Sequence, residues 1–121
     1  MSYAASAYAR VSQTVLTPRE AEAAVLIKAA ARLQAIQDNW PQPLPTVNEA
    51  LGFNQKVWTI LATAATEPDA PLPGNLKNSM AHLGAFVLTR TLDAMVAPDR
   101  DKLTALISIN RELATGLRGN P

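Results

Sequence analysis

The sequence predicts an all-α protein: one domain over residues 1–121, an antiparallel helical bundle of four principal helices plus a short N-terminal helix. Three observations predict this fold. The 121 residues include 22 alanines and only 5% aromatic residues, and alanine loses no side-chain entropy on entering a helix. The apolar residues recur every three or four positions, and no segment alternates with the period of two typical of strands. Nine prolines divide the chain into segments of helical length.

Prolines mark the ends of the predicted helices. Two clusters, at residues 41–45 and 68–73, each contain three prolines. Because proline has no amide donor and clashes with the preceding turn, we expect neither cluster to lie inside a helix. Pro18 and Pro98 stand alone before apolar-periodic segments, as expected of a proline in the first turn of a helix. At the entrance to the first cluster, Trp40 is expected to close one end of the bundle.

The first two predicted helices cover residues 3–13 and 17–38. One side of the short first segment is formed by Tyr3, Ala7 and Val11. The second segment opens with a capping box, in which Thr17 can cap the amide three residues later and Glu20 can reach back. Its apolar stripe consists of Val25, Leu26, Ala29, Leu33 and Ile36. A stripe of this width indicates the side of the helix that packs on the core.

The third and fourth predicted helices follow the two proline clusters. The third covers residues 46–65 and opens with a second capping box, from Thr46 to Glu49. One face of it is formed by Leu51, Asn54, Trp58 and Leu61. The fourth begins after Pro73-Gly74, and its stripe consists of Leu76, Met80, Leu83, Val87, Thr91 and Met95. Both patterns follow the spacing of a helix with one buried side.

The fifth predicted helix begins at Pro98. We expect Asp99 and Asp101 in its first turn, where the helix dipole favours negative charge, and Gly116 or Gly119 at its end. Its stripe consists of Leu103, Leu106, Asn110, Leu113 and Leu117. Taken together, the predicted structural core consists of Leu26, Leu33, Leu51, Trp58, Leu61, Leu83, Val87, Leu106 and Leu113.

Composition excludes several classes of function. The chain has no cysteine and one histidine, so it has no thiol nucleophile, no cysteine-based metal site and no histidine pair. Its net charge of +1 gives no electrostatic reason to bind nucleic acid. Charged residues interrupt the longest apolar stretch, and the first ten residues do not resemble a secretory signal. We therefore expect a cytoplasmic protein with no cofactor, no metal and no membrane insertion.

Three short features suggest chemistry, and each has a structural explanation that we favour. His82 has no partner spaced to complete a catalytic triad, and is read as a surface or boundary residue. The pair Asp99 and Asp101 resembles part of a cation site, but a helix start explains both residues. The sequence from Gly116 to Gly119 resembles an RNA-clamping loop, but it lies at a helix end, where glycine is a common terminator.

Five residues are candidates for partner binding. Asn54 and Asn110 each interrupt an apolar stripe, and a buried amide without partners costs about 1–3 kcal/mol. They either fix the packing of the helices, which we favour, or contact a partner. Tyr3, Tyr8 and Val11 lie on the first segment, where aromatic residues either cover the bundle or form part of an interface.

Four ordered segments carry a resemblance to a known family. They are Pro18-Arg19-Glu20, then Asn54-Gln55-Lys56-Val57-Trp58, then Leu72-Pro73 with Leu76, Phe86-Val87 and Thr91, and finally Leu106-Ile107-Ser108-Ile109-Asn110-Arg111 with Gly116-Leu117. Together they resemble FlaF, the flagellar biosynthesis regulator family of alphaproteobacteria. The resemblance covers nearly the whole chain in order.

This resemblance implies a function without enzymatic activity. It implies a small cytoplasmic helical protein that binds flagellin as a secretion chaperone and promotes flagellin synthesis, opposed to the repressor FlbT. The terminal segments of flagellin, as implied partners, are amphipathic helices that are disordered before assembly. The short N-terminal helix is then expected to lie near an apolar groove that accepts such a helix. Two alternatives stay open: an RNA-binding regulator of flagellin translation, and an adaptor that acts through FlbT.

Overall fold

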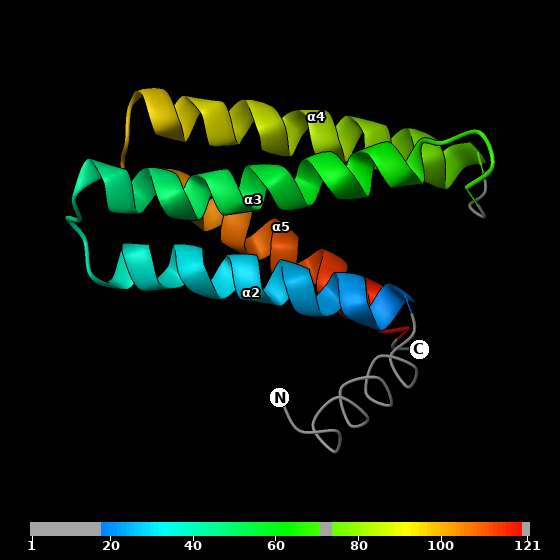
Figure 1. The fold of residues 1–121 in the computed structure, drawn as a ribbon, viewed down its shortest axis with the longest axis horizontal. Helices are drawn as coiled ribbons and strands as arrows, with labels where there is room; N and C mark the ends of the chain where they lie inside the picture. The colour runs from blue at the N-terminus through cyan, green and yellow to red at the C-terminus, as the bar shows by residue number, and fades with distance from the viewer. Residues whose placement is uncertain (1–17, 71–73, 120–121) are drawn as a thin grey trace, which may run out of the picture.

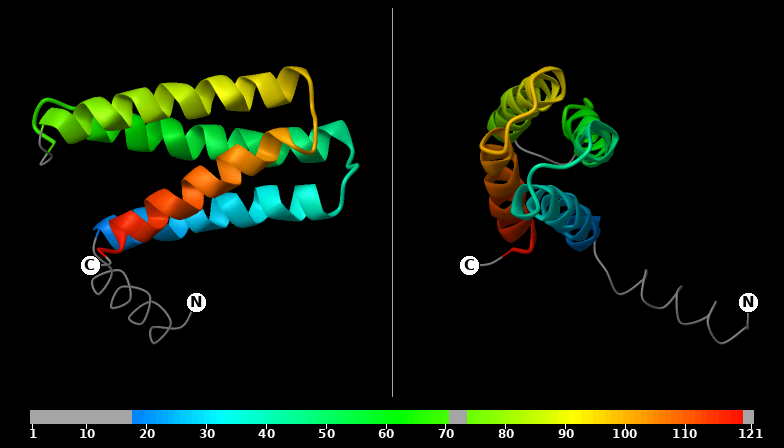
Figure 2. Two further views of the ribbon diagram at one scale, coloured as in Figure 1. Left: turned by 180° about the vertical axis from the view of Figure 1, so that it is seen from behind. Right: turned by 90° about the vertical axis from the view of Figure 1, so that its left-hand side faces the viewer.

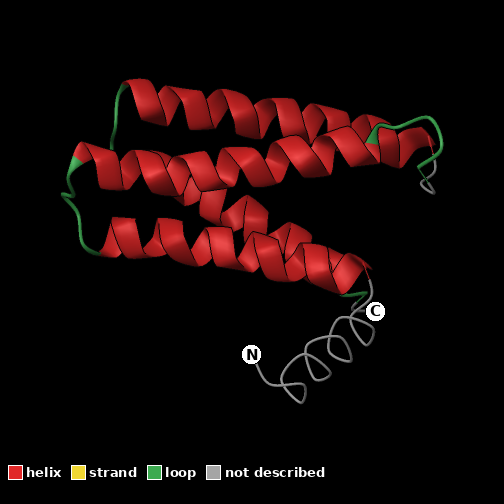
Figure 3. Ribbon diagram, viewed as in Figure 1, coloured by secondary structure: helices red, strands yellow, loops and turns green. Residues whose placement is uncertain are grey.

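The described part of the chain consists of α-helices and the loops that join them. The computed structural model describes residues 18–70 and 74–119, and the predicted short helix over residues 3–13 lies outside them. The four helices are α2 (Pro18–Asp38), α3 (Leu44–Ala65), α4 (Gly74–Val96) and α5 (Lys102–Leu117) (Figures 1 and 3). No strand occurs among these residues. The prediction of an all-α, four-helix fold is confirmed.

The helices form a ring in which each contacts two others. Consecutive helices are antiparallel, with α3 between α2 and α4, and α5 behind them (Figure 1). Contacts join α2 to α3, α3 to α4, α4 to α5 and α5 back to α2. The two short turns that lead into α3 and α5 lie at the same end of the molecule (Figure 2). This arrangement places one core between all four helices.

Most of the predicted core residues are buried. Those at or below 8% exposure are Leu26, Leu33, Leu51, Trp58, Leu61, Val87 and Leu106. Leu83 and Leu113 are half-buried and pack against this cluster. Val25, which the predicted stripe of this helix included, is 39% exposed and lies outside the core. It lies about 100° around the helix from Leu26, where α3 covers only part of the surface.

The start of α3 differs from the prediction. The helix begins at Leu44 after Pro43, without any side-chain cap, so the capping box proposed from Thr46 is wrong. The amides of Thr46 and Val47 donate to the Pro43 carbonyl at 3.0 and 3.1 Å. Pro45 therefore lies in the first turn, although we expected the whole proline cluster to lie outside a helix. A proline is tolerated there because amides of the first turn have no acceptor within the helix.

The start of α5 also differs from the prediction. Pro98 and Asp99 precede the helix, which begins at Lys102, and Asp101 occupies the N-cap position. The amide of Asp101 donates to Oδ1 of Asp99 at 2.9 Å, which forms an Asx turn. The two aspartates thus shape the turn before the helix and do not lie in its first helical turn. At the other end, Gly119 has a φ of 69°, and the prediction that a glycine ends this helix is confirmed.

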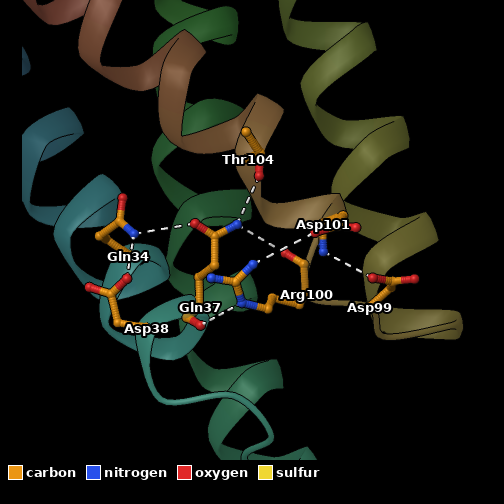
Figure 4. A network of polar contacts seen from close by, with 7 residues as sticks. All are labelled: Gln34, Gln37, Asp38, Asp99, Arg100, Asp101 and Thr104. Carbon is orange, nitrogen blue, oxygen red and sulfur yellow. Dashed lines mark hydrogen bonds and ion pairs between the residues drawn. The ribbon is translucent and has the colours of Figure 1, made fainter.

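A polar network joins the end of α2 to the start of α5 (Figure 4). The side-chain amide of Gln37 donates to the Arg100 carbonyl at 3.0 Å and to Oγ1 of Thr104 at 2.8 Å. In return, Nε of Arg100 donates to the Gln37 carbonyl at 3.2 Å. Next to this network, Trp40 is partly buried and packs against the core cluster, as expected for a residue that closes the end of the bundle.

Close packing between α3 and α4 predicts opposite effects for two glycine substitutions. A Cβ added at Gly84 would lie 2.8 Å from Cβ of Ala62, whereas one added at Gly52 meets nothing within 4 Å. Gly84→Ala should destabilise the protein by about 1–3 kcal/mol because the helices must separate. Gly52→Ala should stabilise it by about 0.5–1 kcal/mol through helix propensity. Urea unfolding followed by circular dichroism measures both, and a Gly84→Ala protein as stable as the wild type would contradict this packing.

Candidate protein-binding surface

Asn110 connects three helices inside the core. Its Oδ1 accepts a hydrogen bond from Nε1 of Trp58 at 2.8 Å, and its Nδ2 donates to Oδ1 of Asn54 at 2.7 Å. The same Nδ2 lies 3.4 Å from the Leu26 carbonyl oxygen, which is the weakest of the three contacts. Since Leu26 belongs to α2, Trp58 and Asn54 to α3, and Asn110 to α5, one amide links them all.

Burial decides between the two interpretations of these asparagines. Both Asn54 and Asn110 are 0% exposed, so no partner can reach either side chain in this structure. The prediction that they contact a partner is therefore wrong for this arrangement of helices, and their role here is structural. Nδ2 of Asn54 is buried without a hydrogen-bond partner, which leaves the network incomplete by one donor.

Helices α4 and α5 separate after the turn that joins them. Nζ of Lys102 lies 3.2 Å from Oδ2 of Asp93 and donates to the Ala97 carbonyl at 2.8 Å, so the start of α5 is tied to the end of α4. From there α5 crosses toward α2 (Figures 1 and 2), and α4 and α5 have the least contact of the four neighbouring pairs. The sides of α4 and α5 that face each other are therefore covered mainly near their junction.

Apolar side chains are partly exposed along these facing sides. We define the α4–α5 flank as Leu83 and Phe86 of α4 with Ile109, Leu113 and Leu117 of α5. Phe86 lies seven residues before Asp93, and Ile109 lies seven residues after Lys102. Each is therefore two turns from the ion pair, on the same side of its helix. Phe86 is 43% exposed, and the guanidinium of Arg90 lies 5.1 Å from its ring centroid.

A second surface, which we name the α2–α3 face, lies on the outer side of α2 and α3. There the guanidinium of Arg32 lies 4.2 Å, and Nζ of Lys28 5.6 Å, from the ring centroid of Phe53. An open recess of about 270 Å³ is lined by Arg32, Ala35, Ile36, Thr46, Glu49 and Ala50. Val25 lies two turns before Arg32, and Ile60 two turns after Phe53. Because α2 and α3 are antiparallel, both extend this face in the same direction.

The other candidates show no catalytic or metal-binding arrangement. His82 is exposed on α4. Asp99 and Asp101 belong to the turn before α5, and within residues 18–70 and 74–119 no group of three histidine, aspartate or glutamate side chains is placed to hold a metal ion. None of the helices in this described part has the length and hydropathy of a membrane span.

The sequence pattern did not reveal the exposed part of the flank, Phe86, which lies outside the predicted stripe of the fourth helix. It placed Leu83 and Leu113 in the core, against which they do pack, and gave no role to Ile109. Tyr3, Tyr8 and Val11 lie outside the described residues, so their assignment as partner contacts stays a prediction. The same apolar residue types cover a core and border an open surface, so only the position of a residue at the edge of a stripe distinguishes the two.

The buried amide network predicts an order of stability losses. Asn110→Ala should destabilise the protein by about 2–5 kcal/mol, because it leaves Nε1 of Trp58 and Oδ1 of Asn54 buried without partners. Asn54→Ala should cost less, about 1–2 kcal/mol, since it also removes a donor that has no partner. Urea unfolding of both variants measures the order, with exposed Ser108→Ala as the control on α5. Equal losses for the two asparagine variants would contradict the network.

Comparison with known proteins identifies the family of this chain. The chain matches the family described as flagellar protein FlaF over residues 4–117. A search of curated proteins and a search of solved structures each found no match. The family match spans all four described helices and every segment on which the resemblance was based. The chain therefore belongs to the FlaF family of flagellar proteins.

Proposed function

We propose that this flagellar protein binds flagellin in the cytoplasm as a non-enzymatic secretion chaperone, and so promotes flagellin synthesis and export. The observation that carries the proposal is the α4–α5 flank, an apolar surface between two helices that separate along their length. An amphipathic helix of flagellin has the matching shape and chemistry. The family match supports the flagellar context, and the flank supports the mode of binding.

The spacing of the flank suits a helix as its ligand. Ile109, Leu113 and Leu117 follow one another at intervals of four residues along α5. An incoming helix presents its own apolar residues at the same intervals, so the two rows can interdigitate. Arg90 on α4 and Glu112 on α5 are exposed polar neighbours of this row, and they can face the polar side of an amphipathic ligand.

Coupled folding gives such a complex the reversibility that export requires. A flagellin terminus that is disordered before assembly must order when it binds, and this entropy offsets part of the favourable burial. The resulting affinity is moderate for the area covered. A chaperone that releases its cargo at a secretion apparatus needs this property.

A charge placed on the flank should weaken flagellin binding. Phe86→Glu should lower the affinity at least about tenfold, because it introduces a charge into an apolar contact. The matched control is Ile60→Glu on the α2–α3 face, where the native side chain is 62% exposed. Isothermal titration calorimetry with full-length flagellin, and with flagellins lacking either terminus, measures the effect and identifies the bound terminus.

Three results of this experiment would count against the proposal. Flagellin that does not bind the native protein would overturn the proposed function. An equal loss of affinity in both variants, or a loss confined to Ile60→Glu, would overturn the assignment to the flank. Circular dichroism of both variants checks that neither has lost its helical fold.

The alternative of direct RNA binding has one observation in its favour. Lys28 and Arg32 lie over Phe53, and exposed Lys56 follows Phe53 by three residues on α3. Cations beside an aromatic ring are typical of single-stranded nucleic-acid surfaces, although Phe53 is half-buried and packs against the core. Three cations are few, however, and the net charge of the chain is only +1, so the phosphate contribution to binding is small.

A gel-shift experiment separates the RNA alternative from the chaperone proposal. With a flagellin leader RNA at physiological salt, we expect no tight binding by the native protein. Tight, salt-sensitive binding that is lost in the double variant Lys28→Glu, Arg32→Glu would reverse the ranking. The remaining alternative, an adaptor that acts through FlbT, is tested by co-purification with FlbT and with flagellin separately.

A further inference from the structure

The α4–α5 flank opens beside the point where the first 17 residues join the bundle. Gln37, near the end of α2, bonds to Thr104, near the start of α5, and Leu26 lies beside Asn110 further along both helices. The two helices are therefore antiparallel, and the beginning of α2 lies at the end of α5 (Figure 1). Residues 1–17 thus connect to Pro18 next to Leu117, the last residue of the flank.

The length of this segment is sufficient to cover the flank. Ile109 and Leu117 are eight residues apart, or about 12 Å along a helix. Seventeen residues extend about 25 Å as a helix, and further in any more extended form. After a turn of a few residues at Pro18, the remaining chain can therefore run beside α5 along the whole flank.

The chemistry of this segment matches an apolar site. Arg10 is its only charged side chain, and four of its residues are alanines, which allow close approach to neighbouring helices. Tyr3, Ala7 and Val11 recur at intervals of four residues, as do Ile109, Leu113 and Leu117 of the flank. The single positive charge of Arg10 is opposite in sign to Glu112, which follows Ile109 by three residues on α5.

We propose that residues 1–17 cover the α4–α5 flank of the free protein, with Tyr3, Tyr8 and Val11 against its apolar row. The segment holds the place of the ligand and shields an apolar surface that would otherwise favour association between copies. A flagellin helix displaces it; this last step rests on the function proposed above. The three side chains thereby contact the chain's own bundle, which is one of the two roles that the sequence left open for this segment; the other is contact with a partner.

Cysteine cross-linking in the full-length protein tests this contact, because the native chain contains no cysteine. One variant combines Ala4→Cys with Ile109→Cys on the flank. Its control combines Ala4→Cys with Ile60→Cys on the α2–α3 face. The two target positions lie at a similar height along α2, and so at a similar distance from Pro18. Ile109 is next to Asn110, which contacts Leu26. Ile60 lies two turns from Phe53, as Val25 lies two turns from Arg32, which contacts Phe53.

Under mild oxidation the flank pair should form an intramolecular disulfide at least about tenfold faster than the control pair, through the high effective concentration of a docked segment. Equal rates, a faster control pair or no cross-link in either variant would overturn the proposal. Cross-linked dimers formed by the flank pair would overturn it as well, because they identify a second copy as the covering chain.

Deletion of residues 1–12 provides an independent measurement. The deletion should strengthen binding of full-length flagellin at least about threefold by removing a competitor, and flagellin should slow cross-linking of the flank pair. Weaker binding after the deletion would make the segment a direct partner contact and overturn the covering role. A flank cross-link without any flagellin binding would overturn only the proposed chaperone function. Flagellin binding without the flank cross-link would overturn only the proposal that residues 1–17 cover the flank.

Discussion

The side-chain amide of Asn110 is the interaction on which the arrangement of the helices depends. It accepts from Trp58, donates to Asn54 and lies near a carbonyl of α2, all without contact to water. Burial of apolar side chains is non-directional and specifies the register of two helices only through packing, whereas a buried amide that loses its partners costs about 1–3 kcal/mol. The amide therefore selects one register of α2, α3 and α5 from the many that burial alone would allow.

This constraint also leads to the open flank. Hydrogen bonds from Asn110 and Gln37 hold α5 against α2 along its length, while Gly84 allows α4 to pack closely on α3. α4 and α5 thus belong to different tight pairs and meet mainly at their connecting turn. A small protein with few aromatic residues can in this way build a full core and still leave an apolar surface partly exposed.

Much of the fold could be predicted because helical periodicity is a local property. The bounds of α2, the start of α4 and the burial of Trp58 and Leu106 follow from spacing and proline positions alone. The starts of α3 and α5 could not be predicted as well. Pro45 entered a first turn, and Asp99 formed an Asx turn in place of a helix start, since several local conformations compete for the same residues at a helix end.

The sequence by itself determined the helices, the side of each that is buried, and the requirement that Asn54 and Asn110 find partners in an apolar stripe. Only the tertiary structure decided that Asn110 bonds to both Asn54 and Trp58. It also decided that Phe86, Ile109 and Leu113 border an open flank. The physical reason is that exposure on the edge of a stripe depends on the direction of the neighbouring helix. That direction is set by contacts between residues more than fifty positions apart in the chain.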